Sequence, residues 1–207
     1  MPHSSPNQLP LSSVLADIAA HSEDEISIAD LTQMFGGRAI GALLFVFGLI
    51  CTLPLPPGAT TIFGLPLLLL APQLVIGASA PWLPKGVKTR TISAAGLART
   101  LPRVISTLRK IEAISRPRLV FLFNPIGERV IGLLCTLLAI VLILPIPLGN
   151  VLPALAVTVL SFSLIQRDGL IALAGYATAI TSASVLALAA HIIVIMFQRA
   201  LMMLSPA

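Results

Sequence analysis

The chain has 207 residues, of which 57% are hydrophobic and only 10% are charged, and its net charge is +5. Because soluble domains carry about 25% charged residues, this composition excludes an ordinary soluble protein and predicts an all-α polytopic membrane protein, a single membrane domain over residues 1–207. No Ser/His/Asp set, carboxylate pair or phosphate-binding loop is visible. We therefore expect no enzyme activity, no catalytic residue, no cofactor and no metal site.

Two short amphipathic helices are predicted before the first apolar run. One covers residues 12–21, and the other begins at Ser27, where Ser27-Ile28-Ala29-Asp30 resembles a capping box and Gly36-Gly37 provides a stop. Together with the apolar hairpin that follows, these helices form the first of two predicted repeated units, residues 11–84.

The first apolar run, residues 39–84, is interrupted by Pro54, Pro56 and Gly58. Proline removes a backbone donor and glycine permits a reversal, so the run is predicted to form two helical arms, 39–53 and 59–83. The first arm would be about 22 Å long, against about 30 Å for the hydrocarbon core of a bilayer. We favour a re-entrant hairpin whose tip lies inside the bilayer over two full crossings joined at the far surface.

Residues 85–118 form a basic segment between the two apolar regions. The positive-inside rule places such a short segment in the cytoplasm. Its apolar residues share one helical face, which predicts an amphipathic helix that lies either in the membrane interface or on the rest of the protein. Nucleic-acid binding is not expected, because the segment lacks interleaved aromatic residues.

The second apolar run repeats the pattern of the first, with Pro145, Pro147 and Gly149 between arms 130–144 and 151–166. This hairpin belongs to the second predicted repeated unit, residues 102–168. A final apolar stretch over 170–198 predicts a transmembrane helix within residues 169–199, which Arg199 would end.

A constant offset of 91 residues aligns the two interrupted runs without a gap. The matches that apolar composition does not explain are Arg38/Arg129, Pro54/Pro145, Pro56/Pro147 and Gly58/Gly149. We interpret the chain as a duplication and favour a parallel over an inverted orientation of the two copies.

Paired interrupted helices point to a binding site near the bilayer midplane, and the helix N-termini beyond each break suit an anionic group. Thr60 and Asn150 could contact such a ligand, although capping of the helices is the favoured role. The binding hypothesis comprises Pro54, Pro56, Gly58, Thr60, Pro145, Pro147, Gly149 and Asn150 at the breaks.

Four charged residues at the edges of the apolar runs complete the binding hypothesis: Arg38, Arg129, Arg167 and Asp168. Anchoring at the membrane interface is the favoured interpretation of these charges. The alternative is that they converge on a polar entrance and bind a phosphate or a sugar-linked anion, or relay protons.

Several short motifs are specific when they are taken together. They are Thr52-Leu53-Pro54-Leu55-Pro56-Pro57-Gly58, Gly64-Leu65-Pro66-Leu67-Leu68-Leu69-Leu70, Ala71-Pro72-Gln73, Pro81-Trp82-Leu83-Pro84, Leu144-Pro145-Ile146-Pro147-Leu148-Gly149-Asn150 and Arg167-Asp168-Gly169. On these motifs the stretch from about residue 9 to residue 194 resembles the ExoD family of bacterial exopolysaccharide-synthesis membrane proteins. The resemblance implies a protein connected with exopolysaccharide production and with tolerance of alkaline stress, and it brings no catalytic residues.

The leading hypothesis is a multi-pass protein of the bacterial inner membrane that supports exopolysaccharide synthesis or export and handles an anionic or lipid-linked intermediate at the paired breaks. A small ion or solute transporter and a non-catalytic scaffold are the alternatives. The expected partners are membrane lipids, a second copy of the chain in a homodimer and polysaccharide-biosynthesis proteins.

Overall fold

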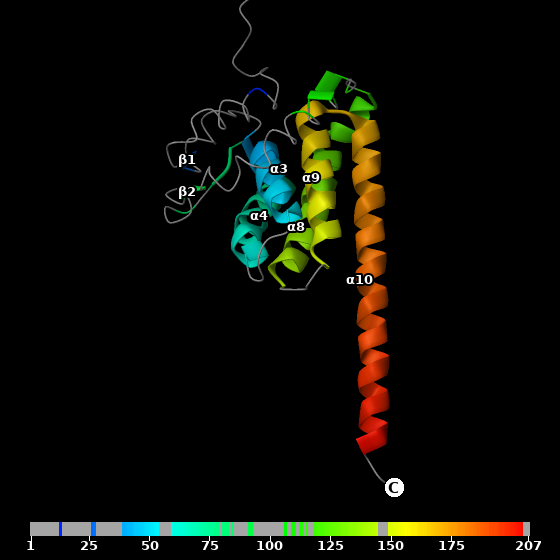
Figure 1. Ribbon diagram of the computed structural model, residues 1–207. Helices are drawn as coiled ribbons and strands as arrows, with labels where there is room; N and C mark the ends of the chain where they lie inside the picture. The colour runs from blue at the N-terminus through cyan, green and yellow to red at the C-terminus, as the bar shows by residue number, and fades with distance from the viewer. Residues whose placement is uncertain are drawn as a thin grey trace, which may run out of the picture.

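A computed structural model describes residues 13, 26–27, 39–53, 59–78, 80–82, 84, 91–92, 106, 109–110, 112–113, 115, 118–144 and 149–204. Five α-helices make up most of this part of the chain (Figure 1). They are α3 (Ala39–Thr52), α4 (Ala59–Val75), α8 (Pro125–Ile143), α9 (Val151–Gln166) and α10 (Gly169–Leu204), and a 3-10 turn, η3 (Val120–Phe123), precedes α8.

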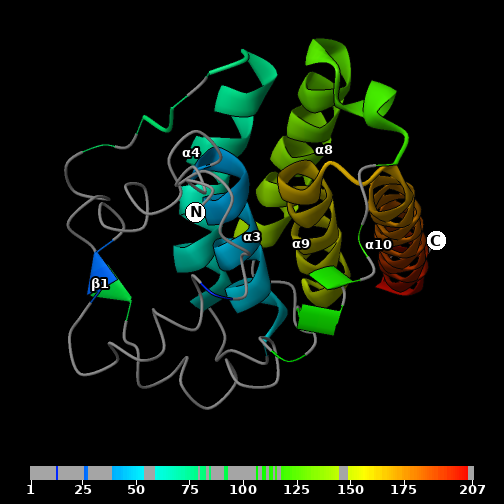
Figure 2. The ribbon, with the colours of Figure 1, turned by 90° about the horizontal axis from the view of Figure 1, so that it is seen from above.

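The four shorter helices form two hairpins that pack face to face. Helix α3 packs against α4 and α9, α8 packs against α4 and α9, and α10 lies beside α9. Seen from above, α3 stands between α4 and α9, and α10 lies outside the group next to α9 (Figure 2).

Glycine contacts fix the direction of the two hairpins. A Cβ atom built on Gly41 would lie 3.4 Å from Ile165 Cγ1, and one built on Gly132 would lie 3.0 Å from Leu74 Cβ. The start of α3 therefore lies beside the end of α9, and the start of α8 lies beside the end of α4. Both hairpins consequently run in the same direction, which is the orientation that the sequence favoured.

The contacts between the hairpins follow the offset of 91 residues. Adding 91 to Gly41 gives Gly132, and adding 91 to Leu74 gives Ile165. The contact between α3 and α9 is thus equivalent to the contact between α8 and α4: the first helix of each hairpin packs against the second helix of the other. This equivalence is what a duplicated unit with a pseudo-two-fold axis would produce.

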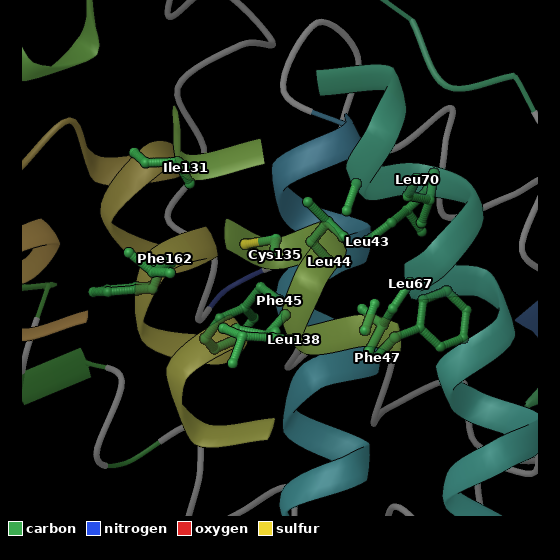
Figure 3. Packing of buried hydrophobic residues seen from close by; sticks show 14 of the residues in the cluster. Leu43, Leu44, Phe45, Phe47, Leu67, Leu70, Ile131, Cys135, Leu138 and Phe162 are labelled. Atoms are coloured by element: carbon green, nitrogen blue, oxygen red, sulfur yellow. The ribbon is translucent and has the colours of Figure 1, made fainter. Parts of the chain in front are cut away.

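The core lies where the four hairpin helices meet (Figure 3). Leu43, Leu44 and Phe47 of α3 are enclosed together with Leu67 and Leu70 of α4. The α8 residues Ile131, Cys135 and Leu138 extend the core, and the Phe45 and Phe162 rings join α3 to α9 with centroids 5.6 Å apart. Burial of Cys135 and Cys51 agrees with their expected role as small apolar residues.

Several boundaries match the predicted arms and others differ. Helices α3 and α9 match the arms predicted over 39–53 and 151–166 almost to the residue. Helix α4 ends at Val75 instead of 83, where Gly77 takes a positive φ of 75° and turns the chain.

The second hairpin and the last helix are longer than predicted. Helix α8 begins five residues early because Asn124 accepts a hydrogen bond from Gly127 N at 2.6 Å and Pro125 stands at the first helical position. Helix α10 continues through Arg199 to Leu204, so Arg199 does not end it as predicted. A charge on an exposed face is compatible with a helix and does not by itself stop one.

The segments outside the bundle are only partly described. Of the described residues in the basic segment 85–118, residues 106, 109–110 and 112–113 are helical, whereas 91–92 form a strand and 115 and 118 belong to no helix. Ile26–Ser27 (β1) pairs antiparallel with Thr91–Ile92 (β2), which is a short exception to the all-α prediction and to the helix start predicted at Ser27. The predicted helices over 12–21 and 27–35 otherwise lie outside the described residues, except for the helical Ser13.

Two of the described helices are long and apolar enough to cross a membrane, namely α8 and the part of α10 from Gly169 to Met196. Helices α3, α4 and α9 are apolar but shorter. Helix α10 continues well past the level at which the hairpins end, and most of its surface there is exposed (Figure 1).

Candidate functional site

A polar cluster joins the two hairpins at their tips. Asn150, which precedes α9, is 5% exposed. Its Nδ2 atom donates to the Thr60 hydroxyl on α4 at 3.2 Å, and it donates to the backbone carbonyls of Leu144 at 3.0 Å and Leu142 at 3.4 Å. Two carbonyl acceptors on one side of the amide fix its orientation, because only the NH₂ group can donate to them.

The neighbouring Thr61 makes a second link between the hairpins. Its hydroxyl donates to the Ile143 carbonyl, the last residue of α8, at 2.9 Å. The end of α8 leaves carbonyls without an intrahelical partner, and side chains from both hairpins satisfy them here. The start of α4 and the end of α8 are thereby held together.

The role of Asn150 differs from the favoured prediction. Its side chain makes no capping hydrogen bond to α9, and it binds the final carbonyls of α8 instead. Capping of the helix that follows is therefore wrong for this residue. Its Oδ1 atom is buried and has no hydrogen-bond partner in the described part of the chain. Gly149 lies in the turn directly before it.

The tip cluster is not duplicated. The offset of 91 residues places Ala59 opposite Asn150, and it places the apolar Val151 and Leu152 opposite Thr60 and Thr61. Each hairpin thus supplies a different part of a single cluster.

A second group of predicted residues lies at the open end of the hairpins, where they begin and end. Arg167 Nη2 lies 3.7 Å from Glu128 Oε1, and this ion pair joins the end of α9 to the start of α8. Arg129 is exposed, and its Nη2 atom lies 3.8 Å from the position of a Cβ atom built on Gly77. Arg129, Arg167 and Glu128 therefore lie at the same end of the described bundle.

Asp168 at the same end is buried, with 4% of its surface exposed. Its Oδ1 atom accepts from Leu170 N at 3.0 Å, and its Oδ2 atom accepts from the Ser115 hydroxyl at 3.2 Å. Asp168 thus caps the start of α10 and ties the basic segment to the bundle.

One buried polar residue was missing from the predicted site. Gln73 Nε2 on α4 donates to the Leu69 carbonyl at 2.8 Å and to the Trp82 carbonyl at 2.7 Å, and Gln73 Oε1 accepts from Trp82 N at 2.6 Å. The signal was present in the sequence as a lone amide inside an apolar run. Its contacts hold the segment after α4 against the helix.

The predicted site residues therefore form two groups at opposite ends of the same helices. Thr60, Gly149 and Asn150 lie at the tips, whereas Arg129, Arg167 and Asp168 lie at the open end, one length of α9 away. Arg38, Pro54, Pro56, Gly58, Pro145 and Pro147 lie outside the described residues. Within the described part, no group of three His, Cys, Asp or Glu residues could hold a metal ion.

Comparison with known proteins assigns the chain to a family. The family model described as "Exopolysaccharide synthesis, ExoD" matches residues 11–188. The chain belongs to the ExoD family. It is 32% identical over 164 residues to the protein named "Protein ExoD" of Rhizobium meliloti (strain 1021), a match that covers 77% of this chain and 68% of that protein.

Synechocystis sp. contains a second relative of this ExoD-family chain. The chain is 31% identical over 152 residues to "Uncharacterized protein slr1875" of Synechocystis sp., with 72% of each chain covered. No solved structure matches the chain. The resemblance that the motifs indicated is thereby confirmed, and the matched residues include both hairpins and the tip cluster.

Proposed function

We propose that this chain is a membrane-embedded, non-enzymatic protein of exopolysaccharide synthesis or export that handles an anionic or lipid-linked intermediate at the hairpin tips. The Asn150–Thr60 hydrogen bond carries the proposal, because it brings polar groups of both hairpins together at the point where both apolar runs are broken. The family description supplies the link to exopolysaccharide synthesis. The tip cluster supplies the place where an intermediate can be held.

Insertion in a membrane is supported by the surface of the bundle. Leu133, Leu137 and Ile140 on α8 are all exposed, and α10 exposes apolar residues along its length. Trp82 and Phe121 at the open end are each 68% exposed. Tryptophan and tyrosine are enriched where a protein meets the membrane–water interface, so the exposed Trp82 fits an open end at that level.

The depth of the tips follows from helix lengths. The 16 residues of α9 rise about 24 Å from the tip to the open end. The apolar part of α10 covers about 42 Å and runs alongside it from the same level. With the open end at one interface, the start of α9 would lie inside a hydrocarbon core of about 30 Å, which favours a re-entrant hairpin. The 19 residues of α8 rise about 28 Å, so the tip of that arm would come close to the far side of the core.

The open end is proposed to face the cytoplasm of the bacterial inner membrane. The Arg118 carbonyl, at the end of the basic segment, accepts from Gly169 N at 2.8 Å at that end of the bundle. Basic segments next to membrane helices remain on the cytoplasmic side and attract anionic lipids. Membrane lipids, a second copy of the chain and polysaccharide-biosynthesis proteins are the proposed partners.

Depth measurement tests the membrane part of the proposal. A nitroxide attached at Val151→Cys, the first residue of α9, should be accessible to oxygen but not to a water-soluble nickel chelate. The same label at Phe121→Cys should be accessible to the nickel chelate as the control. Accessibility of position 151 to the chelate would place the tip in water and remove the re-entrant arrangement.

A complementation assay tests the function. In a strain that lacks its own copy, the wild-type gene should restore exopolysaccharide and growth at alkaline pH, and Asn150→Leu should not. Thr178→Val, which removes only a hydroxyl bonded to its own helix on α10, is the matched control. Flux of a labelled ion through protein reconstituted in liposomes would favour the transporter alternative, and full activity of Asn150→Leu would favour a scaffold.

A further inference from the structure

We infer that the tip cluster recognises a hydroxyl group of a saccharide, through the buried Oδ1 atom of Asn150, and not the anionic group of the intermediate. This inference rests on the proposed function and names the part of the intermediate that the tips bind. Its starting point is the one acceptor of the cluster that has no partner among the described residues.

An unpaired carbonyl oxygen at this depth selects a donor. Leaving a buried acceptor unsatisfied is unfavourable, and a ligand that donates to it removes that penalty. A fully ionised phosphate or carboxylate only accepts hydrogen bonds, and its oxygens would meet the lone pairs of Asn150 Oδ1. A sugar hydroxyl can donate to this oxygen.

The surroundings of Asn150 also suit a hydroxyl. The N-termini of α4 and α9 meet here, as the Asn150–Thr60 bond demonstrates, and the first backbone N–H groups of a helix have no intrahelical acceptor. A hydroxyl can donate to Oδ1 and accept from one of these N–H groups at the same time. Neither a purely anionic nor a purely cationic group can use both sets of partners.

The remaining contacts of Asn150 prevent it from turning its NH₂ group toward a ligand. Reversal of the amide would bring Oδ1 against the carbonyls of Leu142 and Leu144, which now accept from Nδ2. The orientation of the acceptor is therefore built into the fold. Because Oδ1 is buried, binding of a ligand hydroxyl to it requires the Asn150–Thr60 contact to open.

The test uses the full chain in phosphatidylcholine nanodiscs and two probes with the same tail, hexyl β-glucoside and hexyl phosphate. Cys51 and Cys135 are buried, so a thiol-reactive dye reports the unfolding temperature. A ligand that binds only the folded protein raises this temperature. We expect the glucoside to raise it for the wild type and the phosphate to leave it unchanged.

Two variants test whether the rise in unfolding temperature that the glucoside causes depends on Asn150 Oδ1. Asn150→Leu should weaken the glucoside response about tenfold in concentration, the equivalent of one hydrogen bond. Thr178→Val removes a hydroxyl that is bonded to Ala174 of its own helix, outside the tip cluster, so its response should equal that of the wild type. If Asn150→Leu does not fold, the comparison of the two probes on the wild type still decides whether the protein binds the saccharide or the anionic group.

Three outcomes overturn the inference. A response to hexyl phosphate without one to the glucoside would leave the proposed anionic intermediate in place and remove the saccharide. A glucoside response that survives in Asn150→Leu would place the sugar elsewhere. A rise caused by added phosphatidylglycerol and lost in Asn150→Leu would assign the hydroxyl to a lipid headgroup. Failure of the proposed function is separate, since it is judged by exopolysaccharide in the complementation assay.

Discussion

Gly132 lies so close to Val75 that a Cβ atom on it would come within 2.9 Å of the Val75 backbone nitrogen. At this contact the backbones of α8 and α4 pack directly against each other. We call such a line of contact between two helices a seam. The offset of 91 residues relates it to the seam between α3 and α9, where Gly41 meets side-chain atoms of Leu164 instead, at 3.2 Å. The two equivalent glycines thus differ in what surrounds them, because backbone cannot move aside as easily as the end of a leucine side chain.

The first prediction compares alanine at these two positions. Gly132→Ala should lower the free energy of unfolding by about 1–2 kcal/mol, because the cost of overpacking exceeds the gain in helix propensity. Gly41→Ala should stay within about 1 kcal/mol of the wild type, since Leu164 can move. Unfolding in dodecyl sulfate titrations measures both, and equal effects of the two substitutions would contradict the packing difference.

Some of this fold could be predicted from sequence and some could not, for physical reasons. The bounds of α3 and α9 follow from proline and glycine breaks, which act locally on the backbone. The start of α8 is also a local signal, in Asn124-Pro125, but the arm predicted from the apolar run begins only at residue 130, directly after the charged Glu128 and Arg129. Charged side chains that reach solvent are compatible with the first turn of a helix. The Asn124 cap and Pro125 therefore determine where α8 begins.

The tip cluster could be predicted only in part. Asn150 and Thr60 could be predicted as site residues, because each follows a Pro/Gly interruption of an apolar run. Their mutual hydrogen bond spans 90 positions of the chain, so no local periodicity could reveal it. The direction of the Asn150 side chain depends on the end of α8, which is a tertiary contact, and local capping rules therefore gave the wrong partner.

The second prediction separates the charge of Asp168 from its role as a cap. Asp168→Ala should cost about 1–2 kcal/mol, because the Leu170 N–H and the Ser115 hydroxyl lose their acceptor. Asp168→Asn keeps an oxygen at the cap and should lose less than half of that. Thermal unfolding followed by exposure of the buried thiols measures the series.

The exposed neighbour of Asp168 is the control for that series. Arg167 is 58% exposed and its partner Glu128 is 35% exposed, so their ion pair is screened by solvent. Arg167→Gln should change stability by less than about 1 kcal/mol. If Asp168→Asn were stable but failed to restore exopolysaccharide, the charge itself would be needed, and anchoring would no longer account for Asp168.

The third prediction concerns Gln73, the polar residue that sequence analysis left out of the site. Gln73→Leu removes both bonds to the Trp82 backbone and leaves that backbone without its acceptor and donor, so we expect a loss of about 1–3 kcal/mol. Gln73→Glu keeps the acceptor for Trp82 N but turns the donor toward Leu69 and Trp82 into a second acceptor, and it should be at least as destabilising.

The position of Trp82 provides the readout, since it is the single tryptophan of the chain. In the wild type its backbone is held against α4, and its side chain is exposed at the open end. Release of the segment in Gln73→Leu should change tryptophan emission and its quenching by brominated lipids before the hairpins unfold. An unchanged emission spectrum together with unchanged stability would mean that other contacts hold this segment, and that the three hydrogen bonds of Gln73 contribute little.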